Sequence, residues 1–113
     1  MKEIAPTTPV TDVDKAVEFY TVQLGFEVGF NNAPVFAMVR RGSVQIGLQR
    51  AGEERPPGTG NCYIWVEDIR AIYEEFSAKG VVFTDDIAHR GEYDLTDFVI
   101  HDPDGNHIGI GGR

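Results

Sequence analysis

The stretch HDPDGNHIGIGGR, residues 101–113, gathers the side chains best suited to hold a metal ion. Asp102, Asp104 and Asn106 offer oxygen atoms at alternate positions, as the start of an EF-hand calcium loop does. The rest of that pattern disagrees, because Gly105 comes one place too early and no closing carboxylate follows. A reverse turn explains the same residues, since Pro presets φ, Asp and Asn cap local N–H groups and Gly accepts positive φ. We therefore predict a turn here and no calcium site.

Composition excludes several classes of function. A length of 113 residues fits a single domain, residues 1–113. Ten Lys and Arg against 18 Asp and Glu give a net charge of −8, which disfavours nucleic acid and favours solubility or a cationic ligand. The single cysteine, Cys62, cannot form an internal disulfide or a thiolate cluster. Without a signal-peptide pattern or a long apolar run, we expect a cytoplasmic protein that has no membrane partner.

Two segments repeat one helical design. VTDVDKAVEFYTVQLGF predicts a helix between an N-cap at Asp12 and a stop at Gly25. VEDIRAIYEEFSAKGVVF predicts a second helix between Asp68 and Gly80. Apolar residues recur at helical spacing in both, so we interpret the two helices as internal copies.

Short extended segments surround each predicted helix. One precedes the helix, in APTTPV and NCYIWV, and three follow it, at residues 26–30, 35–40 and 44–49 and at residues 81–84, 96–101 and 107–111. The chain is therefore predicted to be α+β, with β-α-β-β-β modules at residues 1–50 and 61–113 joined by a Gly/Pro-rich linker, residues 51–60. We expect the modules to form a curved mixed sheet around a groove, with the helices outside.

Strand alternation predicts which side chains line that groove. In VQIGLQ, the apolar set that includes Ile46 should lie under the helix, which leaves Gln45, Gly47 and Gln49 toward the groove. The same reasoning sends His107 and Gly109 to the groove in HIGIG, and Asn61, Tyr63 and Trp65 in NCYIWV. Pro9 cannot donate to a strand ladder, so the first strand should be an edge or an arm exchanged between subunits.

VTDVDKAVEFYTVQLGFEV, YIWVEDIRAIYEEFSAKGV and DFVIHDPDGNHIG resemble the vicinal oxygen chelate superfamily, which includes glyoxalase I, extradiol dioxygenases and bleomycin-resistance proteins. In metal-dependent members the resemblance implies four His or Glu ligands, and these positions correspond here to Ala5, Gly47, Asn61 and Gly109. This set offers at most one amide oxygen, so we expect no metal, no other cofactor and no catalytic residue. His89 and His101 are interpreted as lying in or beside loops without a paired ligand.

The metal-free bleomycin-resistance branch is the group that the chain resembles most. Its members imply a homodimer that sequesters a cationic drug in grooves between subunits. A planar group would stack on Tyr63, Trp65 or Tyr93, and a cation would sit near Asp97 or Glu92. The predicted ligand-binding residues are Phe30, Phe36, Gln45, Gln49, Asn61, Tyr63, Trp65, Tyr93, Asp97 and His107.

Other interpretations of the same residues stay open. Tyr63, Trp65, Phe30 and Phe36 could be ordinary core aromatics, and a hydrogen-bonded structural histidine would explain His107. The chain could also be a glyoxalase- or dioxygenase-like enzyme that uses other metal ligands, or one that uses His107 as an acid or base. A dimer module whose groove is filled by its own side chains is the third possibility. The sequence does not reveal the natural ligand or whether one chain or two complete the groove.

Overall fold

The computed structural model describes residues 1–113 and contains two modules of the same design. The first consists of β1 (Thr7–Val10), α1 (Val13–Glu18), the π-helix η1 (Phe19–Gln23), β2 (Glu27–Asn32), β3 (Phe36–Arg41) and β4 (Val44–Arg50). The second consists of β5 (Asn61–Trp65), α2 (Ile69–Ala78), β6 (Phe83–Arg90), β7 (Leu95–His101) and β8 (His107–Gly112). The predicted α+β repeat is therefore confirmed.

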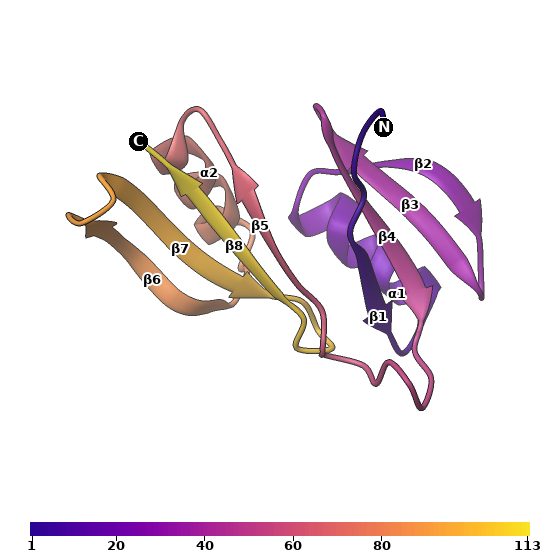
Figure 1. The fold of residues 1–113 in the computed structure, drawn as a ribbon. Helices are drawn as coiled ribbons and strands as arrows, with labels where there is room; N and C mark the ends of the chain where they lie inside the picture. The colour runs from indigo at the N-terminus through magenta and orange to yellow at the C-terminus, as the bar shows by residue number, and fades with distance from the viewer.

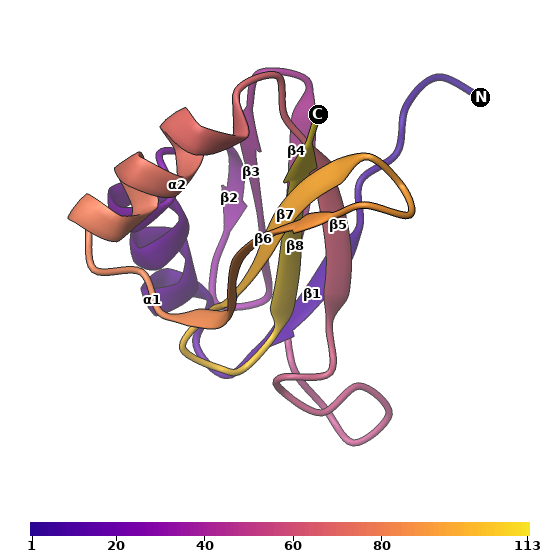
Figure 2. The same ribbon diagram turned by 90° about the vertical axis from the view of Figure 1, so that its left-hand side faces the viewer.

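Each module folds into one mixed four-stranded sheet. The strand orders are β1-β4-β3-β2 and β5-β8-β7-β6. The first strand of each module runs parallel to the last, and the other pairs are antiparallel. The modules lie side by side, and both helices are on one side of the molecule (Figures 1 and 2). Because β1 is an edge strand, Pro9 is accommodated there as predicted.

The predicted helix ends are confirmed by their hydrogen bonds and backbone angles. Asp12 accepts a bond from the Lys15 amide at 3.1 Å, and Asp68 accepts one from the Ala71 amide at 3.0 Å. Gly25 and Gly80 end the two helices with φ angles of +74° and +73°.

Two features of the elements differ from expectation. The first helix changes from α to π geometry at Phe19, which the apolar spacing did not indicate. Strand β6 continues to Arg90 instead of ending near residue 84. Register shifts between Phe83 and Asp85 and between Asp85 and Ala88 let β6 carry acidic residues that normally disfavour strands.

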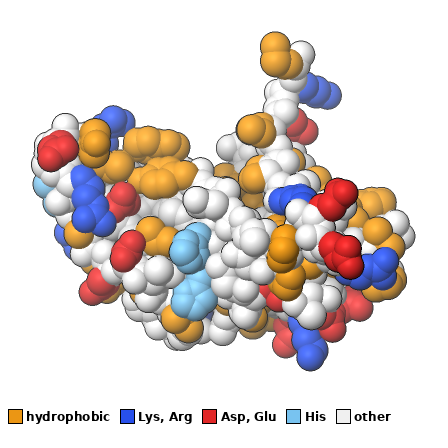
Figure 3. Space-filling model, turned by 60° about the horizontal axis from the view of Figure 1, so that its bottom comes forward, with side chains coloured by type: hydrophobic (Ala, Val, Ile, Leu, Met, Phe, Trp, Pro, Cys, Tyr) orange, Lys and Arg blue, Asp and Glu red, His pale blue; other side chains and the backbone are white.

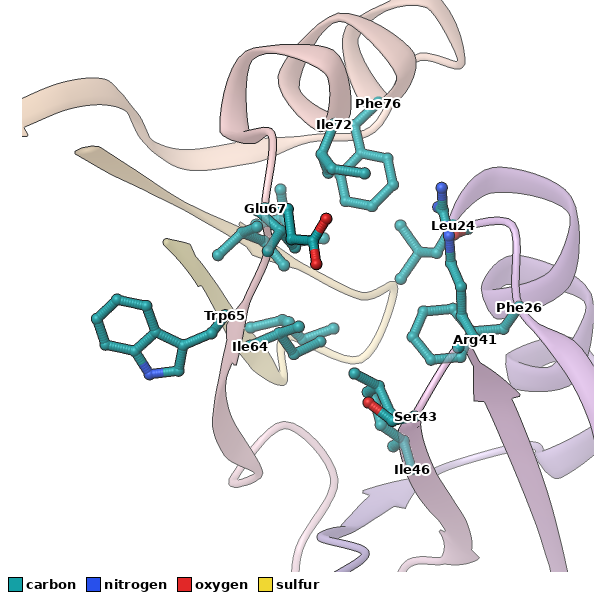
Figure 4. Close-up of a pocket in the computed structure, with 16 residues that line it drawn as sticks. Leu24, Phe26, Arg41, Ser43, Ile46, Ile64, Trp65, Glu67, Ile72 and Phe76 are labelled. Carbon is teal, nitrogen blue, oxygen red and sulfur yellow. The ribbon is translucent and has the colours of Figure 1, made fainter. Parts of the chain in front are cut away.

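The helix-facing sides of the two modules meet in one apolar core. A single cluster of 17 buried residues includes the predicted helix-facing pairs Ile46 with Leu48 and Ile108 with Ile110. Ile46 and Ile64, from different modules, point into a shared cavity of about 420 Å³ (Figure 4). The cavity is thus lined mainly by helix-facing residues, and Trp65 is the one predicted ligand-binding residue in its lining.

An ion pair bridges the modules beside this cavity. The guanidinium of Arg41, in β3, donates two 2.8 Å hydrogen bonds to the carboxylate of Glu75, in α2. These bonds hold the pKa of the Glu75 carboxyl below its usual value, against the opposing effect of burial. Arg41 also donates to the Leu24 carbonyl at 2.8 Å, so the pair fixes α2 relative to the end of η1.

The DPDGN segment forms the predicted turn, and its polar groups are used within the protein. Asp102 is buried and accepts hydrogen bonds from the amides of Asp104 (3.0 Å) and Asn106 (2.9 Å). Its other oxygen accepts from the Asn106 side chain and from the Tyr20 hydroxyl, both at 2.9 Å. Burial, followed by the Asp102 carboxylate, raises the pKa of Tyr20, which therefore remains a neutral donor.

Asn106 extends this network across both modules. Its side-chain nitrogen donates to the Pro9 carbonyl at 2.8 Å, and its side-chain oxygen accepts from the Gly60 amide at 2.7 Å. The Asp104 carboxylate accepts from the Thr11 hydroxyl at 2.6 Å. The three side chains that suggested a calcium loop thus join the first module to the second.

We expect Asp102→Ala to lower the free energy of unfolding by about 3 kcal/mol or more, because it leaves several buried donors without an acceptor. Chemical denaturation followed by circular dichroism measures this loss. Asp85→Ala, which removes an exposed carboxylate, is the control and should change the value by no more than about 0.5 kcal/mol. Equal stability of the two variants would contradict a structural role for the Asp102 network.

Candidate functional site

The ring of Tyr63 lies directly on the backbone of β8. Parallel pairing puts Tyr63 opposite Gly109 and Trp65 opposite Gly111. A Cβ atom on Gly109 would approach Tyr63 Cδ2 to 2.7 Å, and one on Gly111 would overlap the Tyr63 hydroxyl oxygen. The ring can therefore occupy this position only because both residues are glycine.

The first module contains a corresponding arrangement. A Cβ atom on Gly47 would approach Cε1 and Cζ of Phe36 to 3.0 Å, so the Phe36 ring lies over Gly47. The ring of Phe30, 57% exposed, lies 6.5 Å from the Phe36 ring. Both sheets thus place an aromatic ring over a glycine that the resemblance to the superfamily assigns to a chelating position.

The four chelating positions do not fit a metal ion. Ala5 lies before β1 and has no donor atom, and aromatic rings cover Gly47 and Gly109. Only the amide of Asn61 remains, whereas divalent metals need several converging carboxylate, imidazole or thiolate donors. No group of three or more His, Cys, Asp or Glu side chains in the chain is arranged to hold a metal.

Polar and charged groups border the Tyr63 ring. Its hydroxyl lies 3.4 Å from Asp97 Oδ2, and Arg90 Nε donates to Asp97 Oδ1 at 3.0 Å. Burial and then the Asp97 carboxylate raise the pKa of Tyr63. The Trp65 ring, 58% exposed, lies 5.6 Å from the Tyr63 ring, and the Arg113 guanidinium lies 5.3 Å from its centroid. Arg90 thus already pairs with the Asp97 carboxylate, and Arg113 already lies over a face of the Trp65 ring.

A cleft brings residues of both modules together at this ring pair. Gln45 of β4 joins Tyr63 and Trp65 of β5 around a volume of about 270 Å³. Ile4 and Pro6, which precede β1, are also part of the lining. The cleft thus brings predicted ligand residues from the two sheets together.

The other predicted ligand residues lie outside this cleft. Gln49 pairs with Phe36 in the sheet and lines a separate polar pocket with Arg55. Tyr93, 68% exposed, lies in the turn between β6 and β7 and stacks on no other ring. Asp97 is already paired with Arg90, so a ligand cation near it must share or displace that partner.

His107 has a histidine neighbour that the sequence interpretation missed. Strand β7 extends to His101, which is the cross-strand partner of His107, and Asn61 is the partner of His107 on the other side. Two histidine side chains lie together on the surface in Figure 3. As expected, His101 lies beside the turn, at the end of β7, but the sequence interpretation did not pair it with His107. The sequence did contain a signal for this pairing, because His101 and His107 directly flank the predicted turn DPDGN.

Residues 4–110 match the model of the Glyoxalase/Bleomycin resistance protein/Dioxygenase superfamily. The chain belongs to this superfamily. A bleomycin resistance protein of Geobacillus stearothermophilus is 29% identical over 125 aligned positions, which cover 96% of this chain and 94% of that protein.

Solved structures agree with this assignment to the superfamily. The bleomycin-binding protein of Streptomyces verticillus, complexed with copper(II)-bleomycin, superposes with a TM-score of 0.83 at 25% identity, covering 97% of this chain and 94% of that one. A lactoylglutathione lyase of Agrobacterium tumefaciens has a TM-score of 0.80 at 18% identity, covering 99% and 94%, and shares the fold. None of the helices has the length and apolar character required to span a bilayer.

We expect Gly109→Ala to force the Tyr63 ring off β8 and to lower the free energy of unfolding by about 1 to 3 kcal/mol, because the new methyl group overlaps the ring. Denaturation measures the stability, and near-ultraviolet circular dichroism reports the ring environment. Gly91→Ala is the control, since nothing lies within 4 Å of its Cβ position. An unchanged aromatic signal in Gly109→Ala would refute the ring placement.

Proposed function

We propose that this protein binds and sequesters a bulky planar aromatic or cationic small molecule of the bleomycin type. One observation carries the proposal: the Tyr63 ring lies over Gly109 beside Trp65, with Asp97 at its edge. The similarity to proteins named for bleomycin resistance and bleomycin binding supports this class of ligand.

The contacts available at this site suit a planar cation. An aromatic group of the ligand would stack on Trp65, and each such contact contributes on the order of 1 kcal/mol beyond area burial. A positively charged group would interact with Asp97 or with the aromatic faces. The net charge of −8 would increase the association rate of a cationic molecule.

We propose binding without chemical conversion as the primary activity. Glycine occupies two of the chelating positions, and we assign no catalytic residue and no cofactor. Burial raises the pKa of the Cys62 thiol, which makes it a poor nucleophile. A tightly bound transition metal together with metal-dependent turnover of a substrate would favour the alternative of an enzyme in the same superfamily.

We propose that a second copy of the chain completes the ligand groove. The rings of Phe30, Phe36 and Tyr63 do not line the apolar cavity of about 420 Å³ between the modules, and several aromatic side chains of the two sheets are exposed. The segment before β1 projects from the body of the molecule (Figure 2), and its Ile4 side chain is 85% exposed. Exchange of this segment between two chains would bury Ile4 and close a groove over Tyr63.

Calorimetric titration with bleomycin and copper(II)-bleomycin tests the ligand proposal. We expect saturable binding to the unmodified protein and about tenfold weaker binding for both Tyr63→Ala and Trp65→Ala, which corresponds to a loss of about 1.4 kcal/mol. Tyr93→Ala tests whether the isolated ring in the β6–β7 turn takes part. Val22→Ala, on the exposed surface of η1, is the control. Absence of binding to either compound and to other planar cations would overturn the proposal.

Sedimentation equilibrium tests the dimer. At micromolar concentration we expect a mass near twice 12.5 kDa, and we expect Ile4→Glu to shift the equilibrium toward monomer because it puts a charge into the buried contact. Val22→Glu makes the same chemical change at another exposed apolar position and should leave the mass unchanged. A monomeric unmodified protein would contradict the proposal.

A further inference from the structure

We propose that His101 and His107 form a two-imidazole site for a divalent transition-metal ion, distinct from the four chelating positions of the superfamily. The inference is independent of the proposed drug-binding function. It rests on the pairing of β7 with β8, on the hydrogen bond of one ring and on the exposure of the other.

The backbone pattern brings the two side chains close together. The His101 amide donates to the Val82 carbonyl and the His107 amide to the Gly60 carbonyl, so both amides point away from the shared strand interface. The next cross-strand pair toward the turn is hydrogen-bonded, because the Asp102 amide donates to the Asn106 carbonyl at 3.0 Å. His101 and His107 are thus a non-hydrogen-bonded pair, the antiparallel arrangement in which Cα atoms approach to about 4.5 Å and side chains are closest.

The network around Asp102 makes this pair rigid. Four hydrogen bonds to the Asp102 carboxylate hold the turn that directly connects the two histidines. The imidazoles therefore do not need a loop rearrangement to converge, which lowers the entropic cost of binding an ion.

The hydrogen bond of the His101 ring also suits a metal ligand. Its Nδ1 lies 2.8 Å from Thr84 Oγ1. In the tautomer that carries the proton on Nδ1, Thr84 accepts that hydrogen bond and Nε2 keeps a free lone pair, as in most metal-bound histidines. The His107 ring is exposed and makes no hydrogen bond within the chain.

Imidazole donors favour copper, zinc and nickel over calcium or magnesium, and copper(II) should bind most tightly by the general order of affinities. The remaining histidine, His89, provides a matched comparison. Its Nδ1 lies 3.2 Å from Thr96 Oγ1, but its cross-strand partner is Thr96 and not a second histidine. His101 thus has a threonine hydrogen-bond partner and a histidine across the strand, whereas His89 has only the threonine.

Calorimetric titration of the metal-free full chain with copper(II) tests the site. All variants carry Cys62→Ser, which removes the thiol as a competing ligand, and this single variant is the background protein. We expect one copper ion per chain and nitrogen superhyperfine splitting from two imidazoles in the electron paramagnetic resonance spectrum. His101→Ala and His107→Ala should each weaken binding at least about tenfold, and Thr84→Val should weaken it about tenfold while leaving both imidazoles in place.

His89→Ala is the control and should bind copper as tightly as the background protein. The site would be refuted if His101→Ala and His107→Ala kept the affinity of the background, or if His89→Ala lost as much affinity as they did. None of these copper titrations contains a drug. A failure to bind copper therefore leaves the ligand proposal untouched, and a failure to bind drug leaves the copper site untouched.

Discussion

Contact between aromatic rings and glycine backbone determines what the two sheets can bind. The ring of Tyr63 occupies the volume above Gly109, and the ring of Phe36 occupies the volume above Gly47. A histidine or glutamate at either glycine would need that same volume for its side chain. An aromatic platform and the chelating centre of the superfamily therefore exclude one another sterically, and this chain has the platform. The rings leave no room for a larger side chain at these two positions.

The arrangement of the modules determines which surfaces remain available. Helix-facing residues of both modules pack into one core, and the Asp102 network and the Arg41–Glu75 pair hold the modules together. The rings of Phe30, Phe36 and Tyr63 do not line the cavity between the modules. The same turn that holds Asp102 also fixes the two histidines opposite each other. One buried polar network thus supports both the module arrangement and a rigid pair of imidazoles on the surface.

Local features of the sequence predicted the elements and the faces of the strands. Asp12 and Asp68 identified the helix starts, and alternation in NCYIWV separated exposed Tyr63 and Trp65 from half-buried Cys62. Features that depend on contacts between distant residues were not predictable in this way. The Tyr63 ring position requires the register of β5 on β8, and the ion pair of Asp97 with Arg90 requires the register of β6 on β7. The π geometry at Phe19 left no sign in the apolar spacing.

We propose that the aromatic platform formed by Tyr63 and Trp65 holds its ligand without a metal. Trp65 is the only tryptophan of the chain, so its fluorescence reports directly on the platform. The decisive measurement is the Trp65 emission of chelator-treated, metal-stripped protein during titration with metal-free bleomycin and related planar cations. We expect a saturable change in emission that added zinc, iron, nickel or manganese does not enhance. A change that appears only after one of these metals is restored would contradict it.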